Sequence, residues 1–275
     1  MIKVAVLSDI HGNLPALEAV LSDVNDLGIN HIIILGDLIT DFSQYTNEVL
    51  HLVRNTATNV IRGNREGYLI NQANNPNDDT WKKHLQFSTL LKTYQRLSEE
   101  DFLYLKTLPR QVSFPCDEKY SLRAVHGSPF SELDTIYEDS IDLISRSLCA
   151  ITENVLLCGH THRPFICSVN KKTIINVGSV GLSFDQEQSA HYTVIQYDQT
   201  DIEINMRKAK YDFSAFMSSC DWDDPWVRLC LKSIEDGKNY CVRFLKEAGL
   251  LFGAGPILND DYCQLFHAWI KKKII

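Results

Sequence analysis

The sequence begins Met1-Ile2-Lys3-Val4-Ala5-Val6-Leu7-Ser8-Asp9-Ile10-His11-Gly12-Asn13, and this stretch sets a pattern that later segments repeat. Residues 2–7 are almost all apolar, which is typical of a strand buried on both faces of a sheet. Asp9 and His11 follow at its C-terminal end. Side chains at positions i and i+2 of an extended chain point the same way, so this carboxylate and this imidazole can converge on one cation. The alternative is a purely structural strand end, with Gly12 and Asn13 forming a turn and a helix N-cap.

Strands and helices alternate through the first 65 residues. Apolar side chains at helical spacing over 14–24 predict a helix that ends at Gly28. A second buried strand (31–35), a second helix through 45–53 and a short third strand (58–61) follow. Because βαβ crossovers are right-handed, these strands are predicted to form a parallel sheet. Open α/β sheets place their sites at the C-terminal ends of such strands.

The middle of the chain is predicted to add helices and a second sheet. Asn, Asp and Pro dominate residues 68–80, which favours a loop or lid. Helices are predicted at 81–91 and 98–108, the second opening with a Ser98–Asp101 capping pattern. Seven short apolar segments predict a second, largely antiparallel or mixed sheet facing the first: 111–114, 122–125, 155–158, 165–169, 172–177, 191–197 and 201–206. The predicted fold is α/β with α+β elements, a four-layer α-β-β-α sandwich of two mixed sheets flanked by helices.

The pattern changes beyond about Tyr211. Aromatic and aliphatic residues now recur at helical spacing, interrupted by Gly, Ala, Gly and Pro at 253–256. We therefore predict a domain over residues 1–210 and a helical C-terminal extension over residues 211–275. The extension is expected to pack on the domain or to cap it.

Composition narrows the functional classes. The chain has 275 residues, a net charge of −8 and a pI near 5.6, and its only basic run is Lys271-Lys272-Lys273. A nucleic-acid groove or a membrane-surface patch is therefore not indicated. The chain shows no signal-peptide pattern and no apolar run long enough to span a bilayer, which predicts a soluble, cytoplasmic protein. Its eight cysteines contain no C-x-x-C pair and are interpreted as buried free thiols.

Five polar clusters each follow an apolar strand: Asp9-x-His11, Gly36-Asp37, Gly63-Asn64, His126-Gly127 and Gly159-His160-Thr161-His162. Four of them contain a glycine beside the ligand-type residue, as needed where the backbone must approach a crowded site. Four of the nine histidines fall in these clusters. Any single one is more often structural than functional, but all four at strand ends predict a common site. The remaining five are assigned no role: His31, His51, His84, His191 and His267.

The order D-x-H, G-D, G-N, H and G-H-x-H resembles the signature of the calcineurin-like metallophosphoesterase superfamily, in particular its compact bacterial or archaeal members. The resemblance runs from about Ile2 to Arg207 and includes the segments 126–129, 159–164 and 176–181. It implies that seven side chains hold two divalent cations, the first bound by Asp9, His11 and His162, the second by Asn64, His126 and His160, and both bridged by Asp37. Mixed nitrogen and oxygen ligands suit manganese, iron or zinc, with manganese favoured.

The resemblance also implies a reaction. Two such ions about 3.5 to 4 Å apart hold a bridging hydroxide that attacks phosphorus in line, so no Ser or Cys nucleophile is required. We assign catalytic roles to Asp37, His126 and Arg65. Where many members of the family carry a histidine after the Gly-Asn pair, this chain carries Arg65. Arginine cannot protonate a leaving group but can bind phosphate oxygens, unless it is a solvated loop residue or pairs with Glu66 or Asp41.

These features favour hydrolysis of phosphodiester or phosphoanhydride bonds in small phosphorylated or nucleotide substrates. Asymmetric diadenosine tetraphosphate hydrolases are similar compact relatives, and a dinucleoside polyphosphate is one candidate substrate. A nuclease, a protein phosphatase and a non-catalytic scaffold of the same fold are the alternatives; intact ligand positions disfavour the scaffold. The aromatic residues Tyr68, Trp222, Trp226 and Tyr240 either line the substrate site or, as is more usual at helical spacing, belong to a core.

Overall fold

The computed structural model describes residues 2–83, 87–115, 120–198 and 201–252, with 264–265, 267–269 and 271–272 near the C-terminus. The break predicted at 253–256 lies outside the described residues. The described elements, in chain order, are β1 (Ile2–Leu7), α1 (Leu14–Asp26), β2 (His31–Ile34), the 3-10 helix η1 (Ser43–Tyr45), α2 (Thr46–Thr56), β3 (Asn59–Val60), α3 (Asn64–Asn74), α4 (Thr80–Lys83), α5 (Ser88–Arg96), α6 (Glu99–Thr107), β4 (Gln111–Pro115), β5 (Ser121–Val125), α7 (Ile141–Cys149), β6 (Val155–Cys158), β7 (Phe165–Val169), β8 (Lys172–Asn176), β9 (Ser189–Tyr197), β10 (Ile202–Lys210), α8 (Phe213–Ser219), α9 (Pro225–Asp236) and α10 (Tyr240–Phe252).

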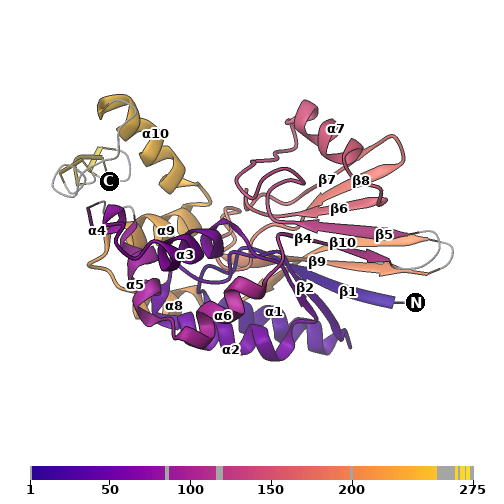
Figure 1. The fold of residues 1–275 in the computed structure, drawn as a ribbon, viewed down its shortest axis with the longest axis horizontal. Coiled ribbons are helices and arrows are strands. Elements are labelled where there is room, and N and C mark those ends of the chain that lie inside the picture. Colours follow the sequence, from indigo (N-terminus) through magenta and orange to yellow (C-terminus); the bar gives the residue numbers. More distant parts are fainter. Residues whose placement is uncertain are drawn as a thin grey trace.

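Two five-stranded sheets form the centre of the molecule (Figure 1). The first has the order β10-β9-β1-β2-β3, and β1, β2 and β3 are parallel, as predicted from the βαβαβ pattern. The second has the order β4-β5-β6-β8-β7, in which β5, β6 and β8 are parallel and both edge strands are antiparallel. Both sheets are therefore mixed.

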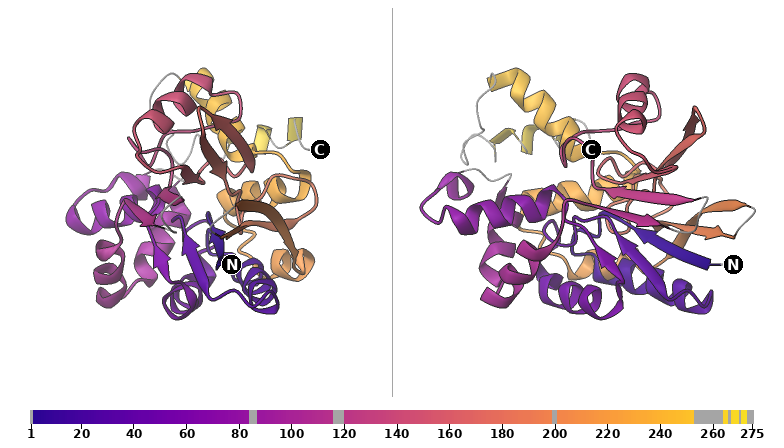
Figure 2. Two further views of the ribbon diagram at one scale, coloured as in Figure 1. Left: turned by 90° about the vertical axis from the view of Figure 1, so that its right-hand side faces the viewer. Right: turned by 45° about the vertical axis from the view of Figure 1, so that its right-hand side comes forward.

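Successive side chains of β1 point to opposite faces of the first sheet, and each face packs against a different layer. Val4 and Val6 belong to an apolar cluster that includes Leu157 of β6, so one face of the first sheet packs on the second sheet. Ala5 and Leu7 belong to another cluster that includes residues of α1 and α2. A third cluster joins α7 to the outer face of the second sheet. The four-layer α-β-β-α sandwich is thus confirmed, and Figure 2 shows it from two further sides.

The late strands were predicted in the wrong sheet. Instead of extending the second sheet, β9 pairs antiparallel with β1, Val6 lying opposite Thr193, and β10 pairs with β9. β2 occupies one edge of β1, so the other edge was open to a strand from anywhere later in the chain. Apolar patterning shows that a segment is a buried strand but not which edge it joins.

The loop or lid predicted over 68–80 is also wrong over most of its length. Residues 64–74 form helix α3, which starts directly after the Gly63-Asn64 pair. Glu66 accepts a hydrogen bond from the Gly63 backbone N–H at 2.8 Å, which caps the helix start, and Leu69 is buried in the core. The asparagines that suggested a loop lie near the C-terminal end of α3, where helix-breaking residues are tolerated.

Other helices differ in detail from the prediction. α6 begins after Ser98, whose side chain accepts from Asp101 N while the Asp101 carboxylate accepts from Ser98 N, as predicted. The helix predicted at 81–91 appears as α4 and α5, and residues 84–86 lie outside the described part. Helix α7 was not predicted, although Ile144 and Leu148 stand four residues apart and are both buried.

Helices follow Lys210, as predicted. α8, α9 and α10 share an apolar cluster that also contains Phe42 and Leu182 from earlier in the chain. These contacts bring the C-terminal segment to the same end of the sheets as α3 and α5 (Figure 1). The six described cysteines are free, and four of them are buried. Among the described residues, no helix has the length and apolar character needed to cross a membrane; the cytoplasmic location stays a prediction.

Candidate metal centre

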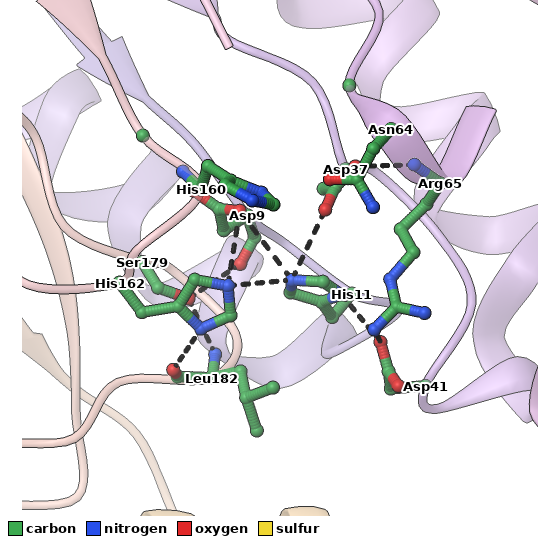
Figure 3. Close-up of polar contacts among 12 residues, drawn as sticks. Asp9, His11, Asp37, Asp41, Asn64, Arg65, His160, His162, Ser179 and Leu182 are labelled. Carbon is green, nitrogen blue, oxygen red and sulfur yellow. Dashed lines mark hydrogen bonds and ion pairs between the residues drawn. The ribbon is translucent and has the colours of Figure 1, made fainter. Parts of the chain in front are cut away.

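Seven predicted ligands lie together where strands of both sheets end. Asp9 and His11 follow β1, Asp37 follows β2, and Asn64 opens α3 after β3; from the second sheet come His126 after β5 and His160 and His162 after β6. All but His160 are buried. Figure 3 labels all of these except His126 and shows the labelled side chains converging from segments far apart in the sequence.

The first group consists of Asp9, His11 and His162. His162 Nε2 lies 3.1 Å from His11 Nε2 and 3.2 Å from Asp9 Oδ1. His11 Nε2 is 3.7 Å from the same carboxylate oxygen. One ligand atom from each residue therefore lies within 4.8 Å of the others, a spacing that could hold a metal ion.

The second group consists of Asp37, His126 and His160, whose ligand atoms also lie within 4.8 Å of one another. Asp37 Oδ2 is 3.4 Å from His126 Nε2. The Asn64 amide joins this group because its Oδ1 lies 3.0 Å from the same imidazole nitrogen. The His126 and His160 rings meet edge to face with centroids 5.1 Å apart.

Two carboxylates stand between the groups. Asp37 Oδ2 lies 3.8 Å from His11 Nε2 in the first group as well as 3.4 Å from His126 Nε2 in the second. Asp9 Oδ1 lies 4.0 Å from His126 Nε2 in the opposite direction. The two groups are thus neighbours, and Asp37 is placed where one carboxylate can face both.

The far side of three imidazoles is anchored. His126 Nδ1 lies 2.8 Å from the Leu35 carbonyl oxygen, and His162 Nδ1 lies 2.7 Å from that of Leu182. A carbonyl can only accept, so each Nδ1 carries the proton in the neutral ring and each Nε2 presents its lone pair to the centre. His11 Nδ1 lies 2.7 Å from Asp41 Oδ2, an ion-pair contact with less favourable hydrogen-bond alignment. Metal-binding histidines are oriented in this way in many proteins.

The centre of the cluster lacks hydrogen-bond donors. Asp9 Oδ1 is buried and has no hydrogen-bond partner among the described residues. It faces the Nε2 atoms of His11 and His162, which in this tautomer are acceptors as well. Buried acceptors that face one another are unfavourable unless a proton or a cation lies between them. The donor set therefore fits divalent cations.

Electrostatics supports the same conclusion. Although burial opposes charge on both rings, Asp41 raises the pKa of His11 to about 10, and Asp37 raises that of His126 to about 9. Burial likewise opposes ionisation of Asp37, but His126 lowers its pKa to about 2. Burial and the nearby His126 lower the pKa of His160 to about 4. A cluster that holds protons this strongly also attracts cations, and a bound cation must displace those protons.

The backbone reaches this arrangement through left-handed conformations, not through the extended i, i+2 geometry expected from the sequence. Five of the predicted ligands have a positive φ between 52° and 64°: Asp9, His11, Asp37, His160 and His162. This region is rarely adopted by residues other than glycine, and surrounding contacts must hold it. Asp9 N donates to the Gly36 carbonyl at 3.0 Å, and Ser179 Oγ donates to the Asp9 carbonyl at 2.8 Å.

Two glycines allow the segments to approach so closely, as the sequence predicted. A Cβ atom added at Gly63 would stand 2.2 Å from Asp37 Oδ1, and one added at Gly159 would stand 2.6 Å from Asp9 Oδ2. Real Cβ atoms are not found at such distances from other heavy atoms. Both positions therefore require glycine for the carboxylates to keep their places.

A sequence model of the calcineurin-like phosphoesterase superfamily domain matches residues 2–200. The chain belongs to this superfamily. It is 27% identical over 225 residues to an uncharacterised protein from Methanocaldococcus jannaschii. The aligned region covers 76% of this chain and 88% of that protein.

Two solved structures have the same fold as this chain. A metallophosphoesterase from Sphaerobacter thermophilus matches with a TM-score of 0.68 and 23% identity, over 86% of this chain and 99% of that one. A hypothetical protein from Pyrococcus horikoshii matches with a TM-score of 0.68 and 21% identity, over 84% and 98% of the two chains.

Asp41 is a central residue of this phosphoesterase-family site that sequence reasoning noted only as a possible partner of Arg65. Its carboxylate is fully buried and accepts from Trp226 Nε1 at 2.7 Å, in addition to its contact with His11. Arg65 Nη2 lies 3.4 Å away. Although burial opposes ionisation, Arg65 and His11 hold the pKa of Asp41 well below its usual range. The available signal in the sequence was an aspartate four residues after Asp37, in the segment that follows a predicted strand.

Arg65 is not a solvated loop residue. It lies in the first turn of α3, and its backbone N–H donates to Asp37 Oδ1 at 2.8 Å. Burial opposes its charge, but Asp41 and Asp37 raise the pKa of the guanidinium above its usual value. The side chain pairs with Asp41, not Glu66, and also lines the cavity over the predicted ligands.

Glu66 has a positioning role that the sequence did not reveal. Its buried carboxylate accepts from the backbone N–H groups of Asp37 (2.8 Å), Leu38 (2.9 Å) and Gly63 (2.8 Å). Burial and the neighbouring Asp37 raise its pKa. One side chain thus ties the loop after β2 to the start of α3, which fixes Asp37 and Asn64 relative to each other.

A cavity of about 330 Å³ opens over the predicted ligands. One part of its wall is apolar and comes from α3, the loop before α7, and α10, with Tyr68, Tyr137, Val242 and Leu245 as its more exposed members. The sequence left open whether four aromatic residues line the substrate site or belong to a core. Tyr68 and Trp226 line this cavity, and Trp226 is also part of the apolar cluster shared by α8, α9 and α10, the C-terminal core. Tyr240 is buried in that core, whereas Trp222 is exposed and donates to the Met217 carbonyl.

The other histidines lie elsewhere. His191 is buried with its Nε2 2.6 Å from Asp185 Oδ2, a structural pair at the base of β9. His31, His51 and His267 are exposed, and His84 lies outside the described residues.

Proposed function

We propose that this chain is a binuclear metal-dependent phosphoesterase that hydrolyses phosphodiester or phosphoanhydride bonds of small phosphorylated or nucleotide substrates. The observation that supports it most is the position of the Asp37 carboxylate, 3.8 Å from His11 Nε2 and 3.4 Å from His126 Nε2. Asp37 belongs to the second of two three-residue groups with metal-ligand spacing, and its carboxylate also lies beside His11 of the first. This is the arrangement that the superfamily resemblance implies for two cations bridged by an aspartate.

In this proposal each ligand keeps the role that the sequence suggested. The first cation is held by Asp9, His11 and His162, the second by Asn64, His126 and His160, and both by Asp37. Two divalent cations held there would polarise the phosphate and activate water for attack on phosphorus. Mixed imidazole, carboxylate and amide ligands favour manganese, with iron or zinc as alternatives.

Arg65 is proposed to bind phosphate oxygens beside the cations. Its guanidinium stays protonated, lines the cavity and is held from behind by Asp41, so it can offset negative charge that develops during attack. It cannot donate a proton to a leaving group. We therefore favour leaving groups that need little protonation, which includes the phosphoanhydrides of nucleotides and dinucleoside polyphosphates.

The apolar wall of the cavity supports an organic substituent on the substrate. Tyr68 and Leu245 stand on it together with Val242, above a floor of ligand-type side chains. Sites for small molecules combine an apolar wall with a few polar groups in this manner. We further propose that residues 1–210 form the catalytic domain and that residues 211–275 cap its site, because α10 supplies part of this wall.

The experiment measures metal content and hydrolysis together. We expect about two metal ions per chain, and hydrolysis of bis-p-nitrophenyl phosphate, p-nitrophenyl phosphate or diadenosine tetraphosphate that depends on added manganese and stops with chelator. Asp37→Asn and His126→Ala should abolish turnover and leave the circular dichroism spectrum unchanged. His51→Ala, at an exposed histidine on α2, is the matched control. Full activity of the two site variants, or a protein that binds no metal and cleaves none of the three, would move the scaffold alternative ahead.

A further inference from the structure

A second, larger cavity adjoins the one over the predicted ligands. It is an open groove of about 1190 Å³. The two cavities share four lining residues, Tyr137, Thr161, Asn239 and Val242, so they meet at a common edge. One wall of the groove comes from the segment before α7 and the segment after His162, and the other comes from the start of α10. In Figure 1, α10 and α7 lie on the same side of the two sheets.

The groove gathers cations in a chain whose net charge is −8. It is lined by Arg163, Lys238, Arg243 and Lys246. Arg243 pairs with Glu247 at 3.0 Å and is therefore largely neutralised. In the described part of the chain, the other three have no carboxylate within ion-pair distance, and all three are exposed. Glu138 and Asp139, on the same wall as Arg163, are the remaining charged residues of the groove.

These cations are placed close to the reaction centre. Arg163 follows the predicted ligand His162 directly, and Lys238 precedes Asn239, which caps the start of α10 by accepting from Val242 N at 3.0 Å. The N-terminal end of a helix adds positive potential at that point. These exposed cations add positive potential at the edge that the groove shares with the cavity over the predicted ligands, where an anionic group of a ligand can lie.

We propose that this groove binds a second anionic group of the substrate, so that the preferred substrates carry at least one further phosphate beyond the one that is attacked. The inference rests on the proposed function, because it takes the predicted metal centre as the place of reaction. Phosphate suits the site because arginine and lysine bind its oxygens well. A long nucleic acid suits it less, because Glu138 and Asp139 interrupt the positive surface and a polyanion needs many phosphate contacts.

The decisive experiment measures binding without catalysis. Inorganic tripolyphosphate is titrated into the metal-free full-length protein in the presence of chelator at low ionic strength, with orthophosphate as the comparison ligand. The groove variant is Lys238→Glu/Lys246→Glu. The matched control is Lys106→Glu/Lys210→Glu, which reverses two exposed lysines on α6 and β10 outside both cavities. A third variant, Glu138→Gln/Asp139→Asn, removes two of the three negative charges that line the groove.

We expect the groove variant to bind tripolyphosphate about tenfold more weakly or worse, since each reversal replaces attraction by repulsion. The control should stay within about twofold of the parent protein, and the third variant should bind more tightly. Equal affinity of the parent and the groove variant would overturn the proposal. So would tripolyphosphate binding no tighter than orthophosphate.

A parallel assay separates this inference from the proposed function. Bis-p-nitrophenyl phosphate carries no further phosphate, so the groove variant should hydrolyse it at an unchanged rate while KM for a nucleoside triphosphate rises. A parent protein that binds tripolyphosphate through the groove but hydrolyses nothing would refute the phosphoesterase proposal alone. A parent protein that hydrolyses the diester but is insensitive to the groove charges would refute the groove alone.

Discussion

Trp226 donates a hydrogen bond from its indole Nε1 to Asp41 Oδ1 at 2.7 Å, and both side chains are buried. The other oxygen of Asp41 lies 2.7 Å from His11 Nδ1. A residue of α9, beyond the part of the chain that matches the family model, therefore reaches a predicted metal ligand through one carboxylate. The C-terminal extension and the candidate metal centre are coupled by this contact.

Removing the indole donor should loosen the first metal position. In Trp226→Phe, Asp41 loses one partner and holds His11 less firmly, so we expect manganese affinity to fall about tenfold. The free energy of unfolding should fall by about 1 to 2 kcal/mol, because the buried Asp41 Oδ1 then keeps only the weak Cys230 thiol as a donor. Isothermal titration with manganese and urea denaturation measure the two effects. Trp222→Phe is the control, since that indole is exposed and donates to a carbonyl away from the site; equal metal affinity in both variants would disprove the coupling.

Arg65 should matter for turnover more than for metal binding. Arg65→Ala is expected to lower kcat/KM about 10- to 100-fold by removing a charged contact with phosphate. Metal content should stay unchanged because Arg65 is not a predicted ligand. Arg54→Ala provides a matched control, as Arg54 also pairs with an aspartate, Asp101, but lies on α2 outside the cavity. Loss of metal in Arg65→Ala would show instead that the residue acts through Asp41.

Metal binding should strengthen as pH rises. In the metal-free protein the pKa of His11 is raised from 6.5 to about 10 and that of His126 to about 9. The protons on these rings stabilise the metal-free protein fully below pH 6.5, and this contribution is lost as the pH rises through 9 to 10. A cation must displace them, so affinity should rise about tenfold per pH unit for each proton released. Calorimetric titrations in buffers of different ionisation enthalpy should show release of roughly two protons near neutral pH; pH-independent affinity would contradict the assignment of these ligands.

Glu66 should stabilise the site as a carboxylate with two accepting oxygens. In Glu66→Gln the amide NH₂ would face a backbone N–H group, because both oxygens accept such bonds. We expect the free energy of unfolding to fall by about 1 to 3 kcal/mol. Metal content should fall as well, because Asp37 and Asn64 lose their common anchor. Urea denaturation and elemental analysis test this, with Glu48→Gln on the exposed face of α2 as control; a variant as stable as the control would exclude the anchoring role.

Most helices and strands could be predicted from the sequence because the signals for them are local. Strand β1 was predicted with its observed bounds, and so were the parallel start of the first sheet and the capped start of α6. Prediction was wrong where composition misled, as in α3, whose asparagines suggested a loop. It was also wrong where pairing is non-local, since the apolar pattern of β9 does not encode β1 as its neighbour.

The sequence by itself determined which residues are available for chemistry: polar ligand-type side chains that end apolar strands, in the order typical of one superfamily. These signals can be read from the sequence because strand ends and their glycines are adjacent along the chain. Only the tertiary structure decided how those side chains meet, through left-handed turns rather than extended segments. It also decided that Trp226 reaches Asp41 across 185 positions and that Arg163 and Lys238 border one groove. Such contacts depend on packing between distant segments, and hydrophobic periodicity carries no information about them.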